Sequence, residues 1–160
     1  MLQATAAPPR VWPFGRRAHR GTLLDMRDRV AKVLIVDDEP TTRFVLKRFV
    51  HDLGHVVIEA SDGQRAWEIL GDNPDFDLVI TDLLMPRLTG EQLIQQVRAS
   101  ATLKALPILV ITSKDDYEEL RHLSDLGASG FARKPLTPHV RSVIQRVLEP
   151  GELPPATKLL

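Results

Sequence analysis

The chain contains no cysteine among its 160 residues, so disulfide bonds and thiolate metal sites are excluded and nothing indicates an oxidising compartment. No apolar stretch approaches the ~18 residues that a membrane-spanning helix needs. The start of the chain also lacks the apolar segment of a secretory signal peptide. The P-loop and the G-x-G-x-x-G fingerprint are both absent, which argues against a nucleotide-binding enzyme. These absences predict a cytoplasmic protein without a membrane span.

The formal net charge is zero, but the charges are unevenly distributed. Residues 1–30 contain six arginines against two aspartates, with several prolines and no helical or strand period, which predicts a flexible basic arm. One alternative is that the start is misassigned and that Met26 is the true first residue. A second alternative is an arm that binds anionic lipid or nucleic acid. Residues 31–160 are mildly acidic, which is unfavourable for nucleic-acid binding. We expect one domain over residues 31–149 and a short tail over residues 150–160.

From Lys32 onward, short apolar runs alternate with amphipathic segments five times. The apolar runs are rich in β-branched residues and do not alternate with polar ones, which predicts strands buried on both faces of a parallel sheet. With short connections and right-handed crossovers, the fold class is a doubly wound α/β sheet with helices on both faces. We expect strands near 32–36, 56–60, 77–81, 107–111 and 129–133, and helices near 40–53, 62–71, 89–100, 114–126 and 137–148. Pro40, Gly54, Asp62 and Thr137 are the predicted helix-boundary residues.

Polar side chains follow four of these runs, where each predicted strand ends. They are Asp37 and Asp38, then Asp82, Thr112 and Lys134. Ligands of open α/β sheets bind outside the carboxyl ends of the strands, so these groups are expected to converge. Three carboxylates repel one another unless a cation joins them, and Mg²⁺ prefers oxygen ligands. The pattern predicts a Mg²⁺ site with Asp82 as a nucleophile that forms an aspartyl-phosphate, and with Lys134 and Thr112 beside the phosphoryl group.

Structural explanations compete with this interpretation at single positions. Asp82 alone could cap a helix, but Met85-Pro86 delays the next helical pattern. Asp37 and Asp38 could cap the helix that begins at Pro40, although this explains one of the two acids and hardly both. The combination of three acids and a lysine therefore favours a functional site.

The motifs together resemble the bacterial two-component response-regulator receiver domain. The matching segments are VLIVDDE at 33–39, TDLLMP at 81–86, ITS at 111–113, GASGFARKP at 127–135 and the Asp62-Gly63 pair. The resemblance covers about residues 32–148 and implies a five-stranded sheet of order 2-1-3-4-5, the flavodoxin-like order that chemotaxis receivers share. It also implies a phosphorylation-dependent signalling switch that stands alone and is not a turnover enzyme.

The resemblance assigns roles to individual residues. Asp82 is implied as the phosphoacceptor for a histidine kinase or a phosphotransfer protein, and Lys134 as the phosphate-binding cation. Mg²⁺ is implied to bind Asp37, Asp38, Asp82 and the backbone carbonyl of Leu84. Thr112 and Phe131 are implied as the switch pair, Lys134–Pro135 as a cis peptide bond, and Leu84 and Lys114 as residues that flank the route of hydrolytic water.

Two alternative functions compete with the receiver. A Mg²⁺-dependent hydrolase on the same fold would use a second aspartate two residues after Asp82, where Leu84 stands. A non-phosphorylated scaffold would lack at least one site residue, and all are present. The expected partners are the phosphodonor and an unknown downstream protein, with the chain as a monomer or a phosphorylation-dependent dimer. On the first helix Phe44 is expected to face solvent, either as an idle surface residue or as an anchor for the phosphodonor.

Overall fold

The computed structural model describes residues 29–149 of the chain. The predicted flexible arm, apart from residues 29 and 30, and the predicted tail lie outside these residues, as does the alternative start at Met26. Strands and helices alternate along the described part. They are β1 (Lys32–Val36), α2 (Pro40–Asp52), β2 (Val56–Ala60), α3 (Gly63–Asp72), β3 (Leu78–Asp82), α4 (Gly90–Ala99), β4 (Ile108–Thr112), α5 (Tyr117–Leu126), β5 (Gly130–Arg133) and α6 (His139–Leu148).

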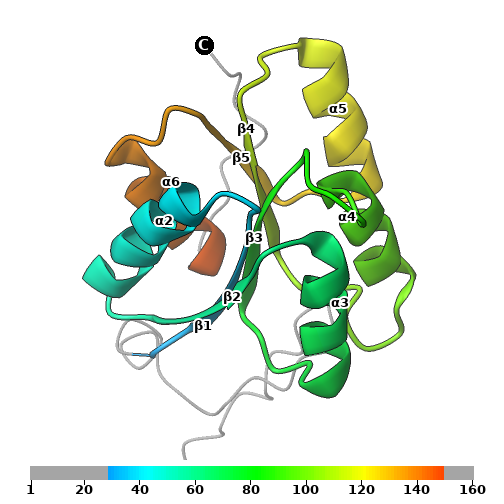
Figure 1. Cartoon of the computed structure of the whole chain (residues 1–160), viewed down its shortest axis with the longest axis horizontal. Helices are drawn as coiled ribbons and strands as arrows, with labels where there is room; N and C mark the ends of the chain where they lie inside the picture. The colour runs from blue at the N-terminus through cyan, green and yellow to red at the C-terminus, as the bar shows by residue number, and fades with distance from the viewer. Residues whose placement is uncertain (1–28, 150–160) are drawn as a thin grey trace, which may run out of the picture.

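The five strands form one parallel sheet in the order β2-β1-β3-β4-β5. Helices α2 and α6 cover one face of this sheet, and α3, α4 and α5 cover the other (Figure 1). The predicted doubly wound fold and its strand order are therefore confirmed. Because all strands are parallel, their carboxyl ends lie along one edge of the sheet.

The core consists of two clusters, one on each face of the sheet. Val33 and Ile35 of β1 pack with α2 and α6, while Leu34 and Val36 pack with α3 and α4. Strands β1, β3 and β4 are buried on both faces, as the unbroken apolar runs predict. The expectation of two-sided burial is wrong for β2, because this strand lies at the sheet edge and leaves Val56 and Ile58 exposed.

Most helix boundaries agree with the sequence. Pro40 occupies the first turn of α2, and the Asp62 side chain caps α3 by accepting a hydrogen bond from the Arg65 backbone N–H at 2.9 Å. The predicted cap at Thr137 is wrong. Pro138 precedes the first residue of α6 with a helical φ of −55°, so Thr137 contributes only its carbonyl, which accepts from the Val140 N–H at 3.0 Å.

Helix α5 begins at Tyr117, later than the predicted start at residue 114. The side chain of Asp116 accepts a hydrogen bond from the Glu118 backbone N–H at 3.0 Å and so caps the helix there. The three residues between β4 and this cap are consequently part of a loop at the carboxyl end of β4. None of the helices in the described part of the chain is long and apolar enough to cross a membrane.

Candidate functional site

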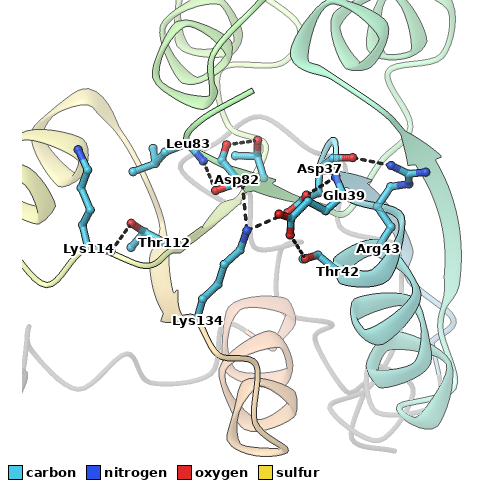
Figure 2. Close-up of polar contacts among 10 residues, drawn as sticks. Asp37, Glu39, Thr42, Arg43, Asp82, Leu83, Thr112, Lys114 and Lys134 are labelled. Carbon is cyan, nitrogen blue, oxygen red and sulfur yellow. Dashed lines mark hydrogen bonds and ion pairs between the residues drawn. The ribbon is translucent and has the colours of Figure 1, made fainter. Parts of the chain in front are cut away.

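The polar residues singled out in the sequence lie together at the carboxyl edge of the sheet. Asp37 follows β1, Asp82 ends β3, Thr112 ends β4 and Lys134 follows β5 (Figure 2). The central strands β1 and β3 pair in register, with Val36 opposite Thr81, which places the two acidic strand ends side by side. The site is therefore built on the most buried strands of the fold.

Three carboxylates form the acidic part of the site. One carboxylate oxygen from each of Asp37, Asp38 and Asp82 lies within 4.8 Å of the others. Asp37 is fully buried, and its Oδ1 accepts a hydrogen bond from the Glu39 backbone N–H at 2.8 Å. Its Oδ2 has no hydrogen-bond partner. Burial raises the pKa of the Asp37 carboxyl, because a charge inside the protein loses its hydration.

Asp82 is held from two sides. Its Oδ1 accepts a hydrogen bond from the Leu83 backbone N–H at 2.8 Å, and its Oδ2 lies 3.1 Å from Lys134 Nζ. The same ammonium lies 3.4 Å from Asp37 Oδ2 (Figure 2). Burial of Lys134 acts to lower the pKa of its ammonium, but the hydrogen bond and charge of Asp82 outweigh that effect and raise the pKa. Lys134 therefore carries a positive charge between two acids.

The donor set fits Mg²⁺. All three acidic residues offer hard oxygen atoms, and among the described residues this is the one group of His, Cys, Asp and Glu side chains close enough to hold a metal ion. The buried Asp37 Oδ2 makes no hydrogen bond and has only the long ion pair with Lys134 at 3.4 Å, although such oxygens are nearly always hydrogen-bonded in folded proteins. A bound cation would satisfy it. The exposed Asp38 leaves the site open to water, which Mg²⁺ keeps as a ligand.

The two residues that the resemblance implies as a switch pair, Thr112 and Phe131, lie on the neighbouring strands β4 and β5. Thr112 is buried, and its Oγ1 accepts a hydrogen bond from the Lys114 backbone N–H at 3.0 Å. Phe131 is partly buried against the core on the α3–α5 side of the sheet. The Lys114 ammonium binds Glu119 of α5 at 2.9 Å and points away from Asp82 (Figure 2). The Lys134–Pro135 peptide bond is cis, as the resemblance implies.

One supporting residue belongs to no motif of the sequence. Arg43, in the first turns of α2, donates from Nη1 to the Asp37 carbonyl oxygen at 2.7 Å and lies 3.4 Å from Glu59 of β2. It thereby ties the backbone of the acidic loop to the neighbouring strand. A cation near a helix N-terminus opposes the helix dipole, so its position was a signal that this arginine has a specific partner.

Comparison with known proteins decides the family. Residues 33–147 match the response regulator receiver domain, which is more than half of the chain. The chain belongs to the receiver domain family. The sequence resemblance is thus confirmed, and nothing in the comparisons supports the hydrolase or the scaffold.

Individual relatives agree with this receiver assignment. The chain is 35% identical over 122 residues to a chemotaxis protein CheY homolog of Campylobacter jejuni, covering 75% of this chain and 94% of the relative. It is 37% identical over 120 residues to the chemotaxis protein CheY of Pseudomonas aeruginosa, covering 74% and 96%. The solved structure of the chemotaxis response regulator CheY4 of Vibrio cholerae superimposes with a TM-score of 0.69 at 33% identity, covering 74% of this chain and 99% of that structure.

This receiver is accordingly a CheY-type response-regulator domain of two-component signal transduction, which signals through phosphorylation. Receiver domains are signalling proteins and not classical turnover enzymes. They generally bind Mg²⁺ through an acidic cluster such as the Asp37, Asp38 and Asp82 group. Receivers of this type interact with histidine kinases and downstream targets.

Proposed function

We propose that Asp82 accepts the phosphoryl group of this receiver, from the phosphohistidine of a histidine kinase or phosphotransfer protein. The observation that carries the proposal is the position of Lys134 Nζ, 3.1 Å from Asp82 Oδ2, beside two further carboxylates. Carboxylates can act as nucleophiles toward phosphorus. In the transfer an Asp82 oxygen forms a bond to phosphorus as the bond from phosphorus to the donor imidazole nitrogen breaks, and the electron pair of that bond returns to the imidazole.

The Mg²⁺ ligands in this proposal are Asp37, Asp38, Asp82 and the backbone carbonyl of Leu84. When bound, the ion offsets the negative charge of the phosphoryl oxygens. The three carboxylates and the Lys134 ammonium have a formal charge of −2, which suits a divalent cation. Leu83 N–H fixes one oxygen of Asp82 throughout, so the carboxylate is oriented before the donor arrives.

Lys134 changes partner as the phosphoryl group arrives. Its ammonium binds a phosphoryl oxygen, and its contact with Asp37 weakens. Lysine suits this role because its ammonium is a compact point charge on a flexible stem. Mg²⁺ and Lys134 together leave the new aspartyl-phosphate with little uncompensated charge.

The proposed switch then follows from local electrostatics. The phosphoryl group attracts the Thr112 hydroxyl, which in this structure accepts a hydrogen bond from Lys114 N–H. Phe131 fills the space that Thr112 leaves. The face formed by α5, β5 and α6 changes, as a population shift between two states biased by a local charge. A downstream protein recognises that face, and residues 31–149 act as a stand-alone domain, as a monomer or a phosphorylation-dependent dimer.

The test is phosphorylation of the full chain by acetyl phosphate, followed by intact-protein mass spectrometry. The parent should gain one phosphoryl group with MgCl₂ and none with EDTA. Asp82→Asn should gain none under either condition, because the amide is not a nucleophile toward phosphorus. Asp75→Asn, at an exposed loop acid, is the matched control and should label like the parent. Labelling of Asp82→Asn at the parent's level would show that another residue is the acceptor.

A further inference from the structure

Arg87 has an unusual backbone in the loop that follows the phosphoacceptor strand. Its φ is +68°, and it is the single non-glycine residue with positive φ in the described part of the chain. A non-glycine residue in this left-handed region carries a conformational cost of order 1 kcal/mol. Strain of this kind persists where surrounding contacts hold it, so the contacts of Arg87 identify what maintains the loop.

The contact that holds Arg87 is an ion pair with a buried acid. The Arg87 guanidinium, through Nη2, binds Oδ2 of Asp62, whose side chain is only 1% exposed although the arginine side chain is 67% exposed. Asp62 also caps α3 through Oδ1, which accepts the Arg65 N–H at 2.9 Å. The two oxygens of Asp62 therefore join the loop between β3 and α4 to the N-terminus of α3.

Two close backbone approaches fix the same loop. A Cβ on Gly63, the first residue of α3, would overlap the carbonyl of Leu88. A Cβ on Gly90 would overlap the carbonyl of Asp82, and the Gly90 N–H donates to the Leu83 carbonyl at 3.0 Å. Residues 83–89 are thus pressed between the end of β3 and the start of α3, with Arg87 at the outer side.

The path of this loop determines the shape of the site. Leu83 N–H orients the Asp82 carboxylate at 2.8 Å, and Leu84 lies between that residue and Arg87. A displacement of the loop would move both the N–H donor and the Leu84 carbonyl. Misplacement by about 1 Å is enough to weaken a metal or catalytic site.

We propose that the Arg87–Asp62 ion pair positions the 83–89 loop for Mg²⁺ binding, so that Arg87 is a positioning residue of the metal site that it does not touch. This inference rests on the proposed function. It assigns a task to an exposed arginine that has no place in the phosphoryl-transfer chemistry.

The sign of the effect on Mg²⁺ affinity separates positioning from simple electrostatics. Arg87 brings a positive charge to the surroundings of a cation site. By Coulomb's law its removal should strengthen Mg²⁺ binding slightly. If the arginine holds the loop in place, its removal should weaken Mg²⁺ binding instead. The two explanations therefore predict opposite changes in one dissociation constant.

The experiment is calorimetric titration of the full chain with MgCl₂. Arg87→Gly removes the side chain, and glycine adopts a positive φ without strain, so the variant loses the ion pair without adding a steric penalty to the folded loop. Its dissociation constant for Mg²⁺ should rise about tenfold, which corresponds to ~1.4 kcal/mol. Arg87→Lys keeps a cation beside Asp62 and should stay within about threefold of the parent, a difference below ~1 kcal/mol.

The matched control is Arg65→Ala, which removes an arginine of α3 that pairs with the exposed Glu68 at 3.2 Å. This variant should bind Mg²⁺ at least as tightly as the parent. Unchanged or tighter binding by Arg87→Gly, or equal weakening by Arg65→Ala, would overturn the positioning role and leave the proposed function standing. A parent chain that binds no Mg²⁺ would overturn both. Melting temperatures in EDTA report stability separately, and a purely structural ion pair would lower them without changing the Mg²⁺ constant.

Discussion

Lys134 Nζ lies 3.1 Å from Oδ2 of Asp82, although the two residues are 52 positions apart in the chain. The contact exists because β3 and β5 belong to one parallel sheet, with only β4 between them, and their carboxyl ends lie on the same side. The fold thereby supplies one cation to a cluster of three acids. The compensation is incomplete, and this imbalance is the physical basis of the expected Mg²⁺ affinity.

Asp37 is expected to weaken the fold that it serves. Its carboxylate is fully buried, one of its oxygens has only a long ion pair with Lys134 and no hydrogen bond, and it lies near two other acids. Asp37→Asn keeps the shape of the side chain and removes the charge, so the free energy of unfolding in EDTA should rise by about 1 kcal/mol. Urea denaturation measures this change, and the same variant should lose Mg²⁺ binding in a titration.

The control for this prediction is Asp38→Asn. Asp38 is exposed, so its charge is hydrated and its replacement should change the unfolding free energy by less than about 0.5 kcal/mol. A lower stability of Asp37→Asn would mean that the Lys134 contact outweighs the burial of the Asp37 charge. Aspartate at position 37 would then be better than asparagine for both stability and metal binding. The expected result is that aspartate binds the metal at the cost of stability.

The sequence was sufficient for the fold and for the convergence of the acids and Lys134 at one end of the strands. Unbroken apolar runs identify central strands such as β1 and β3, and a polar residue directly after such a run must emerge at the ligand edge of the sheet. The apolar pattern was misleading for a strand that was assumed to be buried on both faces but has a neighbouring strand on only one side. Val56 and Ile58 belong to an apolar run, yet β2 is an edge strand and leaves them exposed.

The long-range ion pairs and hydrogen bonds outside the strand ends could not be predicted. Arg98 of α4 donates from Nε to the Gly127 carbonyl at 3.0 Å and from Nη1 to the Leu106 carbonyl at 2.7 Å. Arg87 reaches Asp62 of another loop in the same way. A long flexible side chain has many partners within reach, and no periodicity in the sequence distinguishes among them. The partner that such a side chain contacts is determined only once the backbone has folded.

Asp62 should contribute to stability in a pH-dependent way. The hydrogen bond from Arg87 holds the pKa of the Asp62 carboxyl below its ordinary value of 3.8, although burial opposes this shift. A pKa that is lower in the folded state means that folding favours the carboxylate. The contribution is therefore complete above the ordinary pKa and is lost as the pH falls through the folded-state value.

Urea denaturation of the parent and Asp62→Asn tests this linkage. Asparagine still caps a helix, so the difference in unfolding free energy reports mainly the ion pair. That difference should be largest near neutral pH and should shrink as the pH falls below the ordinary value of 3.8. A difference that stays constant down to strongly acidic pH would argue against a lowered pKa.

The lifetime of the phosphorylated form should depend on Leu84. Leu84 is 68% exposed two residues after Asp82, and its apolar side chain cannot orient water, so hydrolysis of the aspartyl-phosphate should be slow. Leu84→Asn introduces an amide that can position a water, and it should speed the decay about tenfold, or ~1.4 kcal/mol in the barrier. Leu84→Met is the apolar control. Decay is followed by mass spectrometry after acetyl phosphate is removed, and equal rates in all three proteins would exclude this role.

Phe44 of α2 is the remaining candidate for recognition of the phosphodonor. It is 68% exposed, one turn from the acidic loop, and its neighbour on the same side, Arg48, is also largely exposed. A groove of about 210 Å³ lies between the same helix and the connection from β5 to α6, and is lined by Thr41, Thr42, Val45, Lys134, Pro135 and Leu136. An exposed aromatic on a helix that also lines a groove reaching Lys134 suits the docking of a donor helix.

The test compares two phosphodonors on Phe44→Ala. Transfer from the cognate protein donor should slow by about tenfold, equivalent to ~1.4 kcal/mol, because an aromatic anchor of the docked complex is lost. Labelling by acetyl phosphate should not change, because that small molecule needs no docking surface. Tyr117→Ala is the matched control, since Tyr117 is also 68% exposed but lies on α5, on the opposite face of the sheet from α2 (Figure 1). Equal loss with both donors would indicate damage to the site itself. No loss with either would make Phe44 an ordinary surface residue, and equal loss in Tyr117→Ala would place the docking surface beyond α2.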